Sequence, residues 1–327
     1  MQLRAGAVAY GGVKLFVRTP NVGLEPIELL TWQRTVAPVF APPATGWSAE
    51  NVYTPVLARN LNGTPYRDGS NNLYLYYNGD NNVGTDYDQV GLATGQNLNS
   101  LTAWPTNPVI PLGTFPSVDA GDAQICSVFH DGTEFIIYYQ GNSTQPGDFT
   151  TGDKVRLALA TSPDGKVITK LGQVIGPGPD GDAEDLYWFK LIPAGHDGLP
   201  RIYYAGKNAS LVFGLMAAVS VSGSLKGPWT RVSNAHLFEH GTTVLGDAWF
   251  ANGLYHFLYA PLTAGEGIQY ATSADGVTIV RRRELLPRRS GEWDSNPYHA
   301  AWVVVDGVNY LLYNGAPGVG IGYSSAG

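Results

Sequence analysis

The sequence is poor in cysteine, in charged residues and in long apolar runs, and each shortage excludes a class of protein. Cys126 is the only cysteine, which excludes a disulfide framework and a zinc site built on several thiolates. Lys, Arg, Asp and Glu make up only 14% of the 327 residues. No apolar run approaches the roughly 18 residues of a transmembrane helix, so we expect no membrane partner.

Basic residues are also scarce, and the formal net charge is -7. Binding of nucleic acid depends on a basic face that neutralises phosphates, so we expect no nucleic-acid partner. The first residues, MQLRAGAVAYGGVKLFVR, contain no long apolar stretch followed by a cleavage site. We therefore expect no signal peptide, and a protein that is cytoplasmic or reaches the outside, for example in a virion, by lysis.

Glycine and proline are abundant, and a strand that closes on tyrosine recurs five times. The 41 Gly and 22 Pro favour many tight turns and few long helices. Asp-Gly or Asn-Gly turns precede four of the copies, and both turn residues readily adopt positive φ. The closing residues of the five copies are Tyr77, Tyr139, Tyr204, Tyr259 and Tyr313.

A further strand follows each copy, and some copies are followed by an outer strand such as Asn107-Pro108-Val109-Ile110. Four short strands in each of five units predict an all-β fold, a five-bladed β-propeller with four-stranded antiparallel blades. The last unit has no outer strand of its own, and Val36–Phe40 resembles the missing one. We therefore expect an N-terminal strand to close the ring and remove an open edge.

These expectations divide the chain into two parts. Residues 36–327 are predicted to form the propeller domain. Residues 1–35 are predicted to form an N-terminal extension, which is an edge strand or an attachment or oligomerisation segment.

Carboxylates and aromatic residues gather where the innermost strand of each unit is expected to begin. In a propeller these strands line a central channel, and carboxylates are disfavoured there unless they are paired or functional. The aromatic rings beside them are candidates for stacking on sugar faces. The candidates are Glu50, Tyr53, Asp122, Glu184, Asp185, Trp188, Asp247, Trp249, Asp294, Tyr298 and His299.

The five-unit rhythm, and the phrase from Ser220 to Gly227-Pro228-Trp229, resemble the five-bladed glycoside hydrolases related to arabinanases, β-xylosidases, levansucrases and invertases. The resemblance covers residues 36–327. It implies a carboxylate base or nucleophile on blade 1, a helper Asp on blade 2 and a Glu general acid on blade 3. Glu50, Asp122 and Glu184 fit these positions, although the family usually carries Asp on blade 1.

Our leading hypothesis is therefore a glycoside hydrolase that acts on a poly- or oligosaccharide. Cleavage of an acetal needs one protonated carboxyl and one ionised carboxylate, and a third carboxylate raises the pKa of the acid. The proposed catalytic residues are Glu50, Asp122 and Glu184. Asp185 is an alternative acid, and Asp247 or Asp294 is an alternative source of a missing carboxylate. All candidates other than Glu50, Asp122 and Glu184 are expected to bind substrate.

Two further functions stay open, together with one structural ion. A non-catalytic carbohydrate-binding propeller, for example a virion-associated glycan binder or depolymerase, fits the departure on blade 1. A scaffold for protein partners is the third option. No cofactor is required, and the family resemblance implies a structural calcium ion, for which His240 and His299 are the candidate positions.

Overall fold

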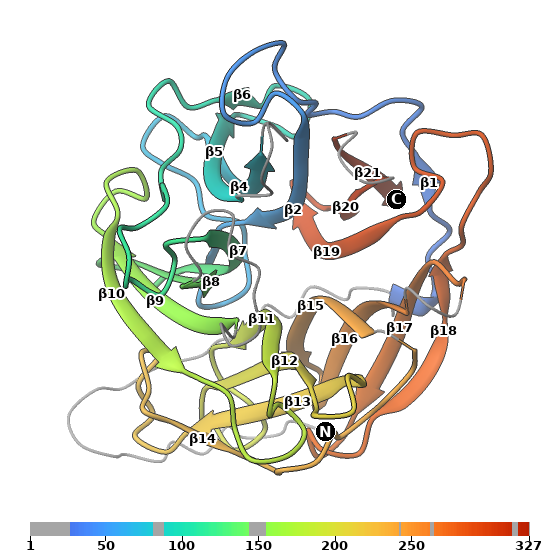
Figure 1. Cartoon of the computed structure of the whole chain (residues 1–327). Helices are drawn as coiled ribbons and strands as arrows, with labels where there is room; N and C mark the ends of the chain where they lie inside the picture. Colours follow the sequence, from blue (N-terminus) through green and yellow to red (C-terminus); the bar gives the residue numbers. More distant parts are fainter. Residues whose placement is uncertain are drawn as a thin grey trace, which may run out of the picture.

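The computed structural model describes residues 27–80, 88–143, 155–241, 243–261, 265–315 and 320–326. These residues form five sheets arranged in a ring (Figure 1), and the one helical element among them is the 3₁₀ turn η1 (Ile27–Leu29). The predicted five-bladed β-propeller is confirmed. None of the described residues belongs to a helix that is long and apolar enough to cross a membrane. The predicted oligomerisation segment falls mainly on residues outside the described ranges.

Each blade runs from an inner strand near the ring axis to an outer strand at the rim, and neighbouring strands are antiparallel. Blade 1 contains β2 (Asn51–Leu57), β4 (Leu73–Asp80), β5 (Gln89–Gly95) and β6 (Thr102–Ala103). Blade 2 contains β7 (Asp122–His130), β8 (Phe135–Asn142), β9 (Arg156–Ser162) and β10 (Thr169–Ile175). The short β3 (Arg59–Asn60) adds to β7 in parallel.

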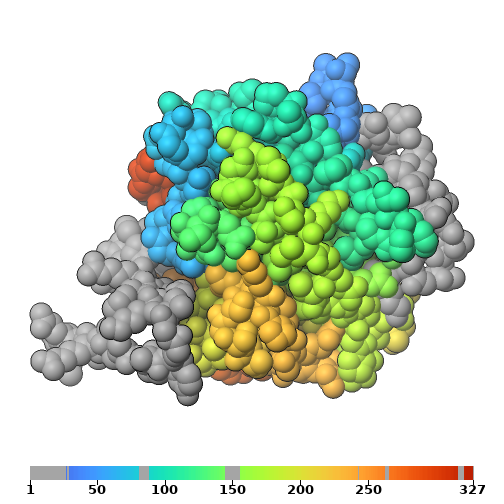
Figure 2. All heavy atoms as spheres, turned by 90° about the vertical axis from the view of Figure 1, so that its left-hand side faces the viewer, coloured from blue at the N-terminus to red at the C-terminus, as the bar shows by residue number. Residues whose placement is uncertain are grey.

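The remaining blades follow the same order. Blade 3 contains β11 (Asp185–Ile192), β12 (Arg201–Lys207), β13 (Phe213–Ser220) and β14 (Trp229–Arg231). Blade 4 contains β15 (Thr243–Ala251), β16 (Leu254–Pro261), β17 (Ile268–Ser273) and β18 (Val280–Leu286). Blade 5 contains β19 (Tyr298–Val305), β20 (Val308–Asn314), β21 (Ile321–Ala326) and β1 (Gln33–Arg34). Figure 2 shows the outer side of the ring, where atoms of blades 1, 2 and 3 pack side by side.

The N-terminal strand β1 closes the ring, as predicted, by pairing with β21 (Figure 1). The pairing residues are Gln33 and Arg34, which precede the expected segment Val36–Phe40; from that segment Phe40 forms a single bridge to Ile321. Blade 1 differs in a similar way. Its outer strand is β6, whereas the expected strand Asn107–Ile110 contacts β5 through one bridge, between Ile110 and Val90.

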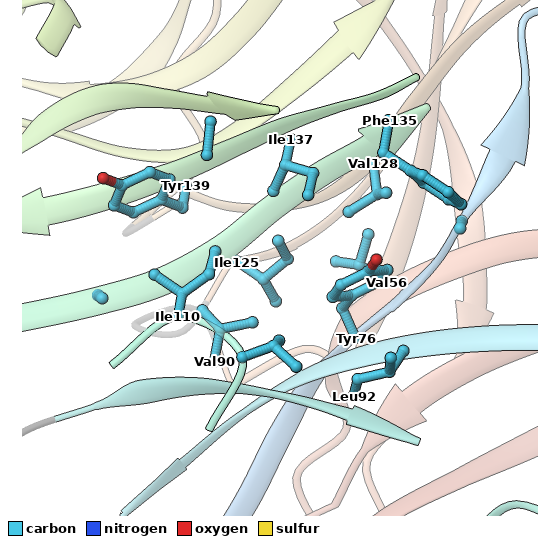
Figure 3. Close-up of a cluster of buried hydrophobic side chains, with 14 of the residues drawn as sticks. Val56, Tyr76, Val90, Leu92, Ile110, Ile125, Val128, Phe135, Ile137 and Tyr139 are labelled. Atoms are coloured by element: carbon cyan, nitrogen blue, oxygen red, sulfur yellow. The ribbon is translucent and has the colours of Figure 1, made fainter. Parts of the chain in front are cut away.

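The recurring tyrosine pair reflects burial of both faces of each blade. Successive strand residues point to opposite faces, so Tyr138 packs between blades 2 and 3 while Tyr139 packs between blades 1 and 2. Five hydrophobic clusters result, one between each pair of neighbouring blades. Figure 3 shows the cluster between blades 1 and 2, where Val56 and Tyr76 of one blade meet Ile125 and Phe135 of the other. This two-sided burial explains why the strands appear as apolar runs rather than as polar–apolar alternation.

The closing tyrosine of each blade is buried, and in blades 2, 3 and 5 its hydroxyl is bound by a carboxylate. In blade 5, Tyr313 donates to Asp294 at 2.7 Å, and Asp294 also binds Arg34 of β1 at 3.1 Å and Arg289 at 2.7 Å. In blade 3, Tyr204 donates to Asp182 at 2.7 Å, and Arg231 of the outer strand lies 2.8 Å from the same carboxylate. We call this arrangement of tyrosine, carboxylate and outer-strand base the polar staple.

Blades 2 and 4 carry the same arrangement with different residues. In blade 2, Asp119 binds Tyr139 at 3.2 Å and Lys170 of β10 at 2.5 Å. In blade 4, His240 takes the place of the carboxylate, with Tyr259 at 3.1 Å and Arg281 of β18 at 3.2 Å. The staple therefore joins the inner loop, the second strand and the outer strand of a blade.

The staple of blade 5 holds the closing strand, so its loss should weaken the whole ring. Asp294 has no exposed surface, and Asp294→Asn leaves Arg34 and Arg289 without their shared counter-charge. We expect a loss of about 3 kcal/mol in the free energy of unfolding, measured by urea denaturation. The matched change Asp306→Asn removes the exposed pair with Arg67 and should cost at most about 1 kcal/mol. Equal losses in the two variants would contradict a closing role for Asp294.

Candidate active site

Every inner strand is interrupted by a bulge near its start, and the bulges shape the mouth of the channel. The pairing register shifts once in each of β2, β7, β11, β15 and β19. At three of these bulges a residue other than glycine has a positive φ: Thr54 (49°), Trp188 (55°) and His299 (50°). Such conformations are costly and occur often at functional sites, where they re-aim side chains.

Three carboxyl groups from blades 1 and 2 lie close enough to Tyr53 of β2 to raise the pKa of its hydroxyl, which burial raises most. Asp80 ends β4, Asp88 immediately precedes β5 and Asp122 begins β7. Asp80 accepts two hydrogen bonds from the side-chain amide of Asn51, at 2.7 and 2.9 Å. The Nε2 atom of Gln124 donates to Asp122 at 3.1 Å and to Asp88 at 2.5 Å, so these two carboxyl groups share one amide.

Asp122 is a buried carboxyl group with a raised affinity for its proton. Burial, and after it the charge of Asp88, raises the pKa of Asp122 well above its usual range. The Oδ1 atom of Asp122 is buried and meets no hydrogen-bond donor among the described residues. We call Asp88 and Asp122, which share the side-chain amide of Gln124, the carboxyl pair.

Aromatic rings from blades 1, 3 and 5 line the channel around His299. The ring centroid of His299 lies 4.6 Å from that of Tyr298, 6.1 Å from Trp188 and 6.2 Å from Tyr53. Burial, with a smaller effect from Lys190, lowers the pKa of His299 to about 3, so this histidine is neutral in the physiological range. Its Nδ1 atom lies 2.7 Å from the hydroxyl of Thr54.

A buried ion pair closes the channel below these residues. The cavity there is lined by all five inner strands, with a free volume of about 20 Å³, enough for one water molecule. Arg59 binds Asp247 at 2.7 Å across it, and Lys190 donates to the carbonyl oxygen of Cys126 at 2.9 Å. Burial lowers the pKa of Lys190 and raises that of the Cys126 thiol to about 11. This cavity therefore has room for a water molecule but not for a sugar ring.

The three predicted catalytic residues lie in different surroundings. Asp122 belongs to the carboxyl pair. Glu184 is half-buried just before β11, and Glu50 is exposed just before β2. Asp185, the alternative acid, begins β11; it accepts the main-chain N–H of Val155 at 3.0 Å and pairs with Lys207 at 3.3 Å.

Five of the eight predicted binding residues lie together, and the other three lie apart from them and from one another. Tyr53, Asp185, Trp188, Tyr298 and His299 surround the upper channel. Asp247 lies in the floor, where it binds Arg59 and the main-chain N–H of Trp302, at 3.0 Å. Trp249 lies further along β15, stacked on His256 at 5.0 Å. Asp294 belongs to the polar staple of blade 5.

The predicted calcium ion has no ready set of ligands near either histidine. His240 binds Tyr259 and Arg281, and His299 binds Thr54. Within the described ranges, no three His, Cys, Asp or Glu side chains come together in a metal-binding cluster. The ion stays a prediction.

Asp80, Asp88 and Gln124 were not predicted, because the candidates were the carboxylates and rings at the starts of the inner strands. Gln124 lies at such a start but is an amide, whereas Asp80 ends the second strand of blade 1 and Asp88 immediately precedes the third. One signal was present: Asp80 ends the tyrosine strand Leu73–Asp80, which pairs with the inner strand and places Asp80 opposite Asn51.

No protein-family model matches the chain, and no curated protein matches its sequence. Solved structures do match over nearly its whole length. A protein described as a glycoside hydrolase has a TM-score of 0.70 at 16% identity, covering 92% of this chain and 93% of its own. A family 117 glycoside hydrolase from Zobellia galactanivorans has a TM-score of 0.66 at 15% identity, covering 91% and 90%. The β-1,2-mannobiose phosphorylase of Listeria innocua has a TM-score of 0.62 at 12% identity, covering 90% and 96%.

The chain has the fold of the five-bladed propeller glycoside hydrolases. These neighbours include hydrolases and a phosphorylase, so one fold carries more than one reaction. The fold alone therefore assigns no reaction to this chain.

Proton binding by Asp122 has a consequence for stability that can be measured without a substrate. Because its pKa is raised in the folded state, the unfolded chain releases this proton at lower pH than the folded chain does. The free energy of unfolding therefore falls as pH rises from the usual Asp range, about 4, through the folded pKa. Asp122→Asn removes this loss, so the variant should become more stable relative to the wild type as pH rises. Plots of the free energy of unfolding against pH for the two proteins should converge at acid pH.

Asp275 supplies a control of opposite sign for these urea titrations. Main-chain N–H groups of Thr278 and Val277 lower the pKa of Asp275, so Asp275→Asn should lose relative stability as pH rises through the acid range. If Asp122→Asn follows Asp275→Asn, or shows no pH dependence, Asp122 does not hold the proton.

Proposed function

We propose that the protein is an O-glycosyl hydrolase that cleaves a poly- or oligosaccharide by carboxylate acid–base catalysis at the mouth of the channel. The observation that carries the proposal is the carboxyl pair, in which Asp88 and Asp122 share the Gln124 amide and burial, followed by the charge of Asp88, raises the pKa of Asp122 well above its usual range. Glycoside hydrolysis needs a proton at the leaving oxygen. The fold of the structural neighbours agrees with this chemistry but does not establish it.

Asp122 is the proposed general acid, and Asp88 is the neighbour whose charge keeps it protonated. The opposing carboxylate comes from blade 3, where Asp185 begins the inner strand in the register position that Asp122 has on blade 2. The neighbouring Lys207 balances the charge of Asp185. Glu184 is the second candidate on this blade. Glu50 is the weakest candidate because its side chain points into solvent.

The aromatic rings give the site its affinity for sugars in this proposal. Tyr53, Trp188 and Tyr298 present apolar faces around the carboxyl groups, a combination found in most pockets for small polar ligands. His299 contacts all three rings and holds them in place while remaining uncharged.

The proposed acid and the opposing carboxylate can be distinguished by comparing substrates whose leaving groups do or do not need a proton. Asp122→Asn should lower kcat/KM on natural glycans by about 10²–10⁴-fold, because the leaving oxygen departs without a proton. The same variant should retain most of its activity on an aryl glycoside whose phenol leaves unaided. Asp185→Asn should be impaired on both substrates, whereas Glu50→Gln should resemble the wild type.

Asp306→Asn is the control for these assays, because Asp306 lies on the exposed turn between β19 and β20. An Asp122→Asn variant with wild-type activity on natural glycans would disprove the acid role. If Glu184→Gln shows the leaving-group pattern instead, Glu184 is the acid.

Charge at the mouth of the channel predicts the kind of sugar. Asp80, Asp88 and Asp122 lie around Tyr53, Asp185 lies near Tyr187, and Lys207 is the cation paired with Asp185. Anionic ligands are repelled by such a field, and salt screens the repulsion. Neutral oligosaccharides should therefore bind more tightly than matched chains containing uronic acids, and the difference should shrink as salt is added. Calorimetric titration at low and high ionic strength tests this, and tighter binding of the acidic chains would contradict it.

A carbohydrate-binding propeller without catalysis is the second candidate. Blade 1 carries Asn51 where blades 2 and 3 carry Asp122 and Asp185, so one inner strand lacks a carboxylate. A virion-associated glycan binder is one form of this second candidate, and a virion-associated depolymerase is one form of the proposed hydrolase. Binding on a glycan array with no product from any bound glycan would favour the non-catalytic function.

A further inference from the structure

A line of side-chain amides joins blade 3 to the carboxyl pair. The main-chain N–H of Trp188 donates to Oε1 of Gln140 at 2.7 Å. Nε2 of Gln140 donates to Oε1 of Gln124 at 2.9 Å. Nε2 of Gln124 then donates to both members of the carboxyl pair. Gln140 is only 1% exposed, so water does not compete for these contacts.

The orientation of each side-chain amide in this line follows from hydrogen-bond chemistry alone. A main-chain N–H can only donate, so the side-chain oxygen of Gln140 must face Trp188 and its nitrogen must face Gln124. Gln124 must then present its oxygen to Gln140 and its nitrogen to the carboxyl pair. The orientation of both amides, which is often ambiguous, is therefore set by the backbone of blade 3.

Corresponding residues of other blades show what is special about Gln140. The residue after the closing tyrosine also binds the inner strand of the next blade in two further cases. Asn78 accepts the N–H of Ile125 at 2.7 Å, and Asn314 accepts that of Thr54 at 3.4 Å. Asparagine is thus long enough for this contact between blades. The additional methylene of Gln140 provides the reach to Gln124.

We propose that Gln140 is a positioning residue of the carboxyl pair, which acts through Gln124 to hold an N–H donor against both Asp88 and Asp122. In this arrangement Gln140 touches neither carboxyl group. It prevents Gln124 from turning its oxygen toward them and thereby fixes the number of protons that the pair binds. The inference rests on the proposed function only where it treats the pair as the catalytic acid.

Several other ionisable groups on the surrounding strands interact electrostatically with the pair. They are Tyr53 on β2, Cys126 on β7, Tyr187 on β11 and Tyr298 on β19, and Asp80 on β4 acts on Tyr53. The Cys126 thiol also lies 3.8 Å from Oε1 of Gln140.

The direction of the expected change in the proton affinity of the carboxyl pair follows from the role of Gln124 as a hydrogen-bond donor. An N–H that binds an ionised carboxylate stabilises the ionised form, and its loss favours the protonated form. A Gln124 that turns around offers an acceptor, which again favours a protonated carboxyl. Both changes make the pair keep its proton to higher pH.

The test uses Gln140→Asn, which converts blade 2 to the residue found in blades 1 and 5. This variant should keep the contact with Trp188 and lose the contact with Gln124. Gln124→Met removes the donor itself, and the double variant combines both changes. The matched control is Gln269→Asn, the same substitution at a fully buried glutamine of blade 4, which binds Arg281 and Glu284.

The readout is the titration of the Asp122 carboxyl carbon by NMR in protein labelled at aspartate, with the signal assigned by its loss in Asp122→Asn. Gln140→Asn and Gln124→Met should each shift the midpoint upward by about one pH unit, a tenfold change in proton affinity. The double variant should shift no further than Gln124→Met, because both changes act through one donor. Gln269→Asn should titrate as the wild type.

Three results would overturn the proposal. The first is an unchanged midpoint in Gln140→Asn, the second an additive shift in the double variant, and the third an equal shift in Gln269→Asn. If Gln140→Asn does not fold, an unchanged midpoint in Gln124→Met, at a half-buried position, also overturns it. The titration needs no substrate, so it stands or falls independently of glycan cleavage. If a glycan is cleaved, the basic limb of the pH profile should move upward in step with the midpoint.

Discussion

The buried phenol hydroxyl at the end of each second strand is the constraint on which the ring depends. Because both faces of a blade are covered by its neighbours, this hydroxyl cannot reach bulk water, and an unpaired polar group there costs free energy. A carboxylate or histidine from the preceding loop binds it in blades 2 to 5, and a basic side chain from the outer strand balances the charge. In blade 5 that base is Arg34, which comes from the opposite end of the chain. The need to hydrogen-bond the buried tyrosine hydroxyl therefore sets the positions of the inner loop and the outer strand, and in blade 5 it also helps to close the ring.

The same requirement explains which aspartates are available for chemistry. Asp119 and Asp182 serve the polar staples of blades 2 and 3, and Asp122 and Asp185 follow each of them three residues later, at the start of the inner strand. The sequence shows acidic residues at both positions. It cannot show which of the two faces a tyrosine hydroxyl and which faces the channel, because a half-buried base such as Lys170 or Arg231 reaches its carboxylate only through the fold. Asp294 illustrates the difficulty: its neighbours in the sequence suggested the channel, and the structure places it in a staple.

The fold was predictable in detail because its signal is repeated five times. The tyrosine pair, the Asp-Gly turns and the missing last strand together specified the number of blades and the need for an N-terminal strand. Short edge segments such as β1 and β6 were placed less well, since a two-residue strand carries little pattern of its own. The site was predicted only in part. Asp122, Tyr53 and Trp188 follow from the inner-strand rule, whereas Asp88 enters from a third strand and depends on how β5 packs beside β7.

Repetition provides a background against which departures become informative. Asn78 and Asn314 show that a short amide suffices to join one blade to the next, so the longer Gln140 is a departure with a purpose beyond joining blades. Asn51 is a departure of the opposite kind, because it replaces a carboxylate and instead binds Asp80 on the neighbouring strand. Both departures lie on blades 1 and 2, which supply the carboxyl pair, and the strained residues Thr54, Trp188 and His299 lie at the bulges of blades 1, 3 and 5. The repeated pattern of the blades does not by itself require these departures, which is the physical reason why we propose the carboxyl pair as the functional site.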